Sequence, residues 1–121
     1  MEQTLKQIGV TDDNLKCLDL LKEYGYIDEL QEGARFAASL ALRKKLYEGV
    51  DLMKVGTKLN NRWTASSLDI GSYFGDIIKH LNICPEDHVV GLRSLIILGL
   101  DYIYKNIKDS EILLIGDLID D

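Results

Sequence analysis

A mainly helical fold, with a short N-terminal strand followed by four helices, is predicted by three features of this chain. Only one proline occurs in 121 residues, so long helices are permitted. Leucine and alanine recur at helical spacing in two stretches before residue 47, and two further apolar stretches of that period follow residue 69. The hydrophobic content of 46% and the length suit one packed core, so we expect a single domain over residues 1–121.

The first elements are a strand and a capped helix. Residues 4–10 are short, apolar and β-branched, which favours a strand. Thr11 is a good N-cap, and the two aspartates after it suit the positive end of a helix dipole. The predicted helix spans about 12–24 and ends before Gly25, a residue that tolerates the left-handed conformation of a helix C-terminus. Its apolar face is Leu15, Leu18 and Leu21.

A second helix is predicted from Asp28, as its cap, to about Tyr47, with Gly49 closing it. Its inner face is rich in alanine, which permits close approach of a neighbouring helix. That face is Leu30, Ala34, Ala37, Ala38, Ala41 and Leu42. Residues 49–68 show neither the helical nor the strand period, and we expect a basic, structured connection.

Two more helices are predicted over residues 69–107. Asp69 opens the first, whose apolar stripe is Ile70, Phe74, Ile77, Ile78 and Leu81. Pro85 suits the first helical position of the last helix, about 86–107. This last helix is apolar around most of its circumference, so we expect it to be central to the fold or covered by another subunit. Its thin polar stripe is Ser94, Asp101, Lys105 and Lys108. The acidic tail, 109–121, either adds a strand, docks on a partner or frays.

The N-terminal third resembles the ribbon-helix-helix proteins of the MetJ and Arc type. The resemblance covers residues 4–46 and rests on Val10-Thr11, Gly25-Tyr26, the pair Glu32 and Arg35, and Ala37-Ala38. It implies a dimer in which one strand from each subunit forms a ribbon that reads DNA. With the apolar helix faces it gives a set of candidate oligomer-interface residues. These are Leu15, Leu18, Leu21, Ala34, Ala37, Ala38, Ala41, Leu95 and Ile96.

A second resemblance extends from Tyr26 to about Ile107. The segments YIDELQEGARFAASLAL, NNRWTASSLD, FGDIIKHL and GLRSLIILGLDYI look like the small DndE-type and associated proteins of bacterial DNA phosphorothioation and phage defence. This resemblance implies a small, helical, oligomeric, non-enzymatic protein that works beside larger subunits.

Charge moves the expected DNA contact away from the ribbon. The formal net charge is −6, yet residues 33–63 carry seven basic and two acidic residues. The amides at the start of the second helix lie beside Asp28, Glu29 and Glu32, whose charge opposes a phosphate. The candidate DNA-contact residues are therefore Arg43, Lys44, Lys45, Lys54, Lys58 and Arg62. The alternative is that these residues form only a solvated surface.

No enzymatic chemistry is predicted. The chain has neither a phosphate-binding G-x-x-x-x-G-K-[ST] loop nor a G-x-S-x-G nucleophile elbow. His80, Cys84 and His88 are spaced by four like zinc ligands on one helix face, but Pro85 interrupts them, and we expect no metal and no cofactor. Two cysteines are too few for a disulfide framework, and no segment has the composition of a membrane span or a secretion signal. A cytoplasmic protein is expected.

The function predicted from these features is that of a non-catalytic accessory or adaptor subunit in a DNA-associated bacterial system, for example in phage defence. Its expected partners are copies of itself as a homo-oligomer and larger protein subunits. The alternative is a DNA-binding protein that uses the basic segment 43–62, either as a ribbon-helix-helix regulator or as a sequence-tolerant binder.

Overall fold

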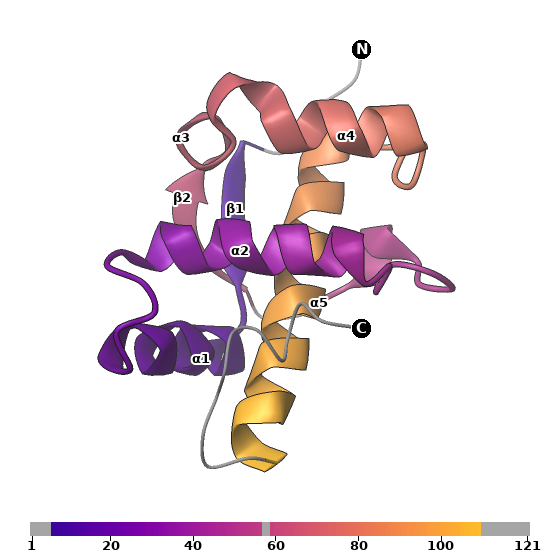
Figure 1. The fold of residues 1–121 in the computed structure, drawn as a ribbon. Helices are drawn as coiled ribbons and strands as arrows, with labels where there is room; N and C mark the ends of the chain where they lie inside the picture. Colours follow the sequence, from indigo (N-terminus) through magenta and orange to yellow (C-terminus); the bar gives the residue numbers. More distant parts are fainter. Residues whose placement is uncertain (1–5, 57–58, 110–121) are drawn as a thin grey trace.

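The helix α5 (His88–Asp109) is the element around which the chain is arranged. The computed structural model describes residues 6–56 and 59–109. Helices α2 and α4 cross α5, α1 lies against it, and a two-stranded sheet packs beside them (Figure 1). The mainly helical fold class and the short N-terminal strand are confirmed. Helix α5 is central, as its nearly all-apolar circumference predicts.

The N-terminal strand finds its partner within the same chain. Strand β1 (Gln7–Val10) pairs antiparallel with β2 (Asn60–Thr64), and Ile8 and Val10 are fully buried. The register places Ile8 opposite Trp63 and Gly9 opposite Asn61, so Arg62 is the extra residue of a β-bulge. The sequence did not predict β2, because the segment NNRWT shows no alternation of apolar and polar residues. Four of its five residues are exposed.

Helix α1 (Asp12–Glu23) confirms the first predicted helix and both of its ends. The Thr11 hydroxyl accepts a hydrogen bond from the Asn14 backbone N–H at 3.0 Å, and the Thr11 N–H donates to Asn14 Oδ1 at 3.1 Å. This reciprocal capping box satisfies two backbone donors that a helix start otherwise leaves free. At the other end Gly25 is left-handed, with a φ of 81°.

Helix α2 (Leu30–Arg43) packs on α5 with almost no space between the two backbones. Ala34, Ala37, Ala38 and Ala41 are completely buried, as the alanine-rich face predicts. A Cβ atom at Gly99 of α5 would lie only 2.1 Å from the carbonyl oxygen of Ala37. Small side chains on both helices therefore set the distance at which α2 and α5 meet.

Both predicted ends of α2 need correction. The N-cap is Glu29, not Asp28, and it makes no side-chain capping hydrogen bond. The helix ends at Arg43, not near Tyr47, because Lys45 is left-handed with a φ of 55°. The N–H of Leu46 then bonds back to the Ala41 carbonyl at 2.9 Å, which closes the helix with a turn that is normally associated with glycine.

The connection between α2 and α4 contains more regular structure than its sequence indicates. After the short helix η1 (Leu52–Lys54) come β2, α3 (Ala65–Leu68) and η2 (Ile70–Ser72). Helix α4 (Tyr73–Leu81) starts four residues later than predicted, because Gly71 and Ser72 both have positive φ. Phe74 and Ile78 are buried as predicted, whereas Ile70 and Leu81 of the same predicted stripe are exposed.

Two predictions about α5 are also wrong. Pro85 lies in a turn, and α5 begins at His88, where Asp87 Oδ1 accepts from the N–H of Val89 at 2.9 Å. Ser94 does not belong to a solvent-facing polar stripe. It is fully buried and its hydroxyl donates to the Leu52 carbonyl, which attaches η1 to α5.

Some predictions fall outside the described residues. They concern the start of the strand before residue 6, Lys58, the side chain of Lys108 and the acidic tail 109–121, of which only the helical backbone of Asp109 is described. Within the ranges that are described, the helices are too short or too polar to cross a lipid bilayer.

The contact between Gly99 and Ala37 gives the first testable prediction. Gly99→Ala adds a methyl group at a place that the Ala37 carbonyl already occupies, so α2 and α5 must move apart. We expect the free energy of unfolding to fall by about 3 kcal/mol. Urea denaturation followed by circular dichroism measures it. Ser39→Ala, on the exposed side of α2, is the control and should change stability by less than about 0.5 kcal/mol. Equal stability of the two variants would show that α2 and α5 do not meet at Gly99.

Candidate functional site

The predicted DNA-contact residues do not all lie together. Arg43, Lys44 and Lys45 follow one another at the C-terminal end of α2, where Arg43 and Lys45 are exposed. The Lys44 ammonium lies 5.8 Å from the centre of the Tyr102 ring, a cation–π contact that attaches this end of α2 to α5. Lys54 forms an exposed ion pair of 3.8 Å with Asp51.

Arg62 belongs to a different part of the surface. It is the exposed bulge residue of β2, and Figure 1 places β2 and the C-terminal end of α2 on opposite sides of α5. A bulge turns a side chain away from the regular sheet direction. The structure therefore separates Arg62, on the sheet, from the basic residues at the end of α2.

Arg35 has a structural role that the sequence does not reveal. Its Nε donates to the Leu68 carbonyl at 2.9 Å, and its Nη2 donates to the Ser67 carbonyl at 3.1 Å. These two bonds satisfy carbonyl groups at the end of α3 and attach α3 to α2.

The predicted oligomer-interface residues lie in the core of the single chain. All of them except the half-buried Leu15 have almost no exposed surface, namely Leu18, Leu21, Ala34, Ala37, Ala38, Ala41, Leu95 and Ile96. The apolar faces of these eight residues meet other elements of the same chain, so in this conformation they offer almost no area to a second copy.

A different apolar surface remains uncovered on α4 and the turn before it. We call it the α4 outer face, made of Ile70, Tyr73, Ile77 and Leu81. Ile70 is 72% exposed, Tyr73 62% and Leu81 45%, while Ile77 is partly buried. Tyr73, Ile77 and Leu81 follow one another at intervals of four, so they share one side of α4, and Ile70 lies in the turn before it. Phe74 and Ile78, which are buried, follow Tyr73 and Ile77 by one residue each, so the exposed and buried apolar residues of α4 form one broad stripe.

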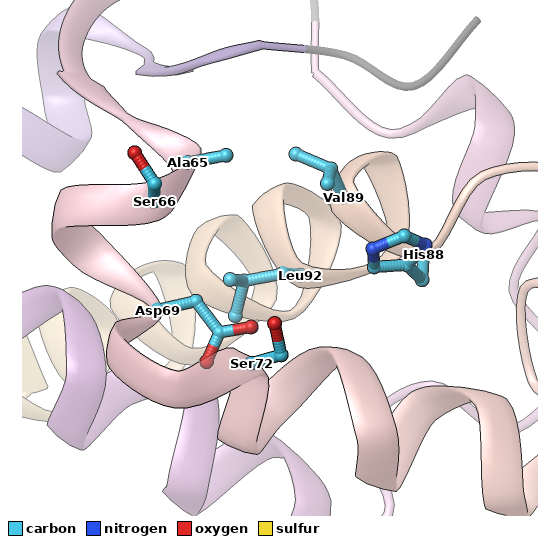
Figure 2. A pocket seen from close by; sticks show the side chains of 7 residues that line it. All are labelled: Ala65, Ser66, Asp69, Ser72, His88, Val89 and Leu92. Atoms are coloured by element: carbon cyan, nitrogen blue, oxygen red, sulfur yellow. The ribbon is translucent and has the colours of Figure 1, made fainter.

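A pocket of about 180 Å³ opens between α3, the turn that carries Ile70 and the start of α5. Its polar lining consists of Ser66, Asp69, Ser72 and His88 (Figure 2). Ala65, Val89 and Leu92 provide the apolar lining. The left-handed conformations of Gly71 and Ser72 turn the chain here, and this turn brings the Ser72 hydroxyl to the pocket.

The Asp69 carboxylate is held in place by the start of α4. Oδ1 accepts from the Phe74 N–H at 2.8 Å and Oδ2 accepts from the Gly75 N–H at 2.9 Å. His88 packs against α4 at a glycine, since a Cβ atom at Gly75 would lie 2.8 Å from its ring carbon Cδ2. Although serine, histidine and aspartate line one pocket, no hydrogen bond among these described residues joins them into a triad, so the arrangement resembles a binding pocket more than a nucleophilic site.

The zinc-like spacing of His80, Cys84 and His88 does not produce a cluster. Helix α4 ends at Leu81 and α5 starts at His88, so the three residues do not share a continuous helix. Across residues 6–56 and 59–109, no group of three or more histidine, cysteine, aspartate or glutamate side chains is arranged to hold a metal ion.

A polar pair that the sequence did not suggest lies at the edge of the core. Asn14 is fully buried, and its Nδ2 donates to Asp101 Oδ1 at 2.9 Å, which connects α1 to α5. Burial raises the pKa of Asp101 above its ordinary value of 3.8, the hydrogen bond from Asn14 opposes this, and the charge of Asp13 adds to it. Burial and then the charge of Asp101 raise the pKa of the Cys17 thiol to about 12. Cys17 is therefore an inert core residue at neutral pH.

Comparison with known proteins finds no match for this chain. No protein-family model, curated protein or solved structure matches this chain, so both family resemblances remain predictions from the residues quoted for them.

The Asn14–Asp101 pair predicts how stability depends on pH. Because the pKa of Asp101 is raised in the folded state, its protonation stabilises the fold below pH 3.8, and this contribution is lost as the pH rises through the folded-state pKa. Asp101→Asn keeps an acceptor for Asn14 and cannot ionise. We expect the stability of this variant relative to the parent chain to rise from pH 4 to pH 7. The rise should be less than about 1 kcal/mol because Asp101 is partly exposed. Urea denaturation at both pH values tests this, and a constant difference between the two proteins would refute it.

Proposed function

We propose that this protein is a non-catalytic accessory subunit that acts through protein contacts, and that the α4 outer face is its docking surface. The observation that carries the proposal is the exposure of Ile70 and Tyr73 in a chain that buries large apolar residues on all of its major helices. Single exposed apolar residues are ordinary, but a group on one side of a helix is typical of a protein interface. Tyrosine is also one of the residues enriched at the centres of interfaces.

The partner is either a second copy or a larger subunit of a complex, in line with the resemblance to small helical proteins of DNA-associated systems. Charge does not fix the orientation of the partner, because Lys79 follows Ile77 by two residues and so lies on nearly the opposite side of α4.

The docking surface is tested by the double substitution Ile70→Ser and Tyr73→Ser. Losing one central apolar anchor costs about 2 kcal/mol of binding free energy, which is a ~30-fold loss of affinity. The double variant should therefore weaken the interaction at least that much. Light scattering over a concentration series measures self-association, and mass spectrometry of the tagged full chain purified from its native cell identifies larger partners. Tyr24→Ser, at an exposed aromatic residue after α1, is the control. The proposal fails if the double variant keeps both the mass and the partners of the parent chain.

DNA binding is the second candidate, and the grouping of Arg43, Lys44 and Lys45 at the end of α2 supports it. Three consecutive cations give a compact contact for phosphates, but the formal net charge of −6 opposes long-range attraction. This candidate therefore requires a short-range, salt-sensitive contact.

A salt titration of duplex DNA binding by fluorescence anisotropy tests this candidate. Arg43→Glu with Lys45→Glu should lower the slope of log K against log salt by about two, since each phosphate contact contributes about one. Lys16→Glu with Lys22→Glu, on exposed positions of α1, is the matched control and should leave the slope unchanged. Absence of binding at low salt, or equal slopes for both variants, removes DNA from the function.

A further inference from the structure

The pocket between α3, η2 and α5 combines one anionic group, neutral acceptors and an apolar wall. Asp69 contributes a carboxylate, and Ser72 and His88 contribute a hydroxyl and an imidazole that can each accept a hydrogen bond. In Figure 2, Asp69 and Ser72 lie on one side of the pocket and His88 on another, with Val89 and Leu92 of α5 forming part of the wall.

Asp69 keeps acceptor capacity for a ligand. A carboxylate offers about four lone-pair positions, and the N–H groups of Phe74 and Gly75 use two of them. These two bonds also hold the carboxylate still, so little ordering is required when a cation arrives.

We infer that this pocket binds an alkylammonium group, presented by a lysine side chain of the docking protein. An ammonium has three donors, and the pocket offers three kinds of acceptor in Asp69, Ser72 and His88. The volume of about 180 Å³ equals about six water molecules at ~30 Å³ each, which is enough for a short alkyl chain and smaller than the usual pocket of a drug-sized ligand. The apolar lining suits the methylene groups of such a chain.

The position of the pocket indicates why the cation comes from a protein. Ile70 lies between the lining residues Asp69 and Ser72, and Tyr73 follows directly, so a partner segment that covers these two exposed side chains passes close to the pocket. The inference rests on the proposed function, and it adds a chemical requirement to it. The partner segment carries a lysine beside apolar residues.

The pocket is tested on the isotope-labelled full chain with n-butylammonium, and with butyrate and 1-butanol as probes of similar shape. Butylammonium should shift the backbone amide resonances of Ser66, Asp69, Ser72 and His88 with millimolar affinity, and the other two probes should not. Ser66 is exposed at the pocket, so Ser66→Phe should obstruct the mouth and abolish the shifts. Ser39→Phe, on the exposed side of α2, is the control and should bind like the parent chain.

Asp69→Asn removes the charge but also one acceptor at the start of α4, so circular dichroism must first show that the variant is folded. A folded variant should lose butylammonium binding. If it is unfolded, Ser66→Phe still decides the question. No shift at these amides with butylammonium, or equal shifts with butyrate, overturns the inference.

The source of the ammonium is tested with a short peptide that carries one lysine between two leucines, and with the same peptide acetylated on that lysine. The lysine peptide should bind about tenfold or more tighter than butylammonium because it also contacts Ile70 and Tyr73. The acetylated peptide should lose this advantage. If the lysine peptide binds no better than butylammonium, the pocket takes a free amine and the inference is wrong as stated. If the pocket binds neither probe while Ile70→Ser with Tyr73→Ser still disrupts a protein contact, the inference fails and the docking surface stands.

Discussion

The contact between Ala37 of α2 and Gly99 of α5 is the constraint on which the rest of the structure depends. The two backbones meet so closely that a methyl group at Gly99 would lie 2.1 Å from the Ala37 carbonyl oxygen. Close-packed interiors do not tolerate such an overlap. Because α5 also contacts α1, α4, β1 and η1, the position of α2 on α5 decides where the other elements can pack.

Polar side chains fix where the helices begin, and this has consequences for the surface. Thr11 and Asn14 cap α1, Asp87 caps α5, and Asp69 accepts two amide hydrogen bonds at the start of α4. The turn through Gly71 and Ser72 separates Asp69 from the helix that it caps. That separation leaves the carboxylate at the edge of a pocket and leaves Ile70 facing solvent.

The surface is divided into regions with different chemistry, and this division supports protein docking over DNA binding. The exposed Ile70 is flanked in the chain by residues of the carboxylate-containing pocket, whereas the basic residues lie at the end of α2 and on the bulge of β2. A groove reader needs several cations on one surface. The structure provides three consecutive cations at one helix end, of which Lys44 also contacts Tyr102.

Sequence periodicity and capping residues were sufficient to predict the helical class, the bounds of α1 and the alanine face of α2, because these depend on neighbours within one or two helical turns. They could not predict β2, whose exposed residues become a strand only because β1 lies beside them. They also predicted a buried Ile70 and an exposed Ser94, and both are the reverse. Ile70 is exposed because the left-handed Gly71 and Ser72 redirect the chain, and Ser94 is buried because its hydroxyl donates to the Leu52 carbonyl. The pocket was beyond sequence reasoning for the same reason. Ser66, Asp69 and Ser72 are near in sequence, but His88 reaches them only when α5 crosses α4, and only tertiary packing decides that contact.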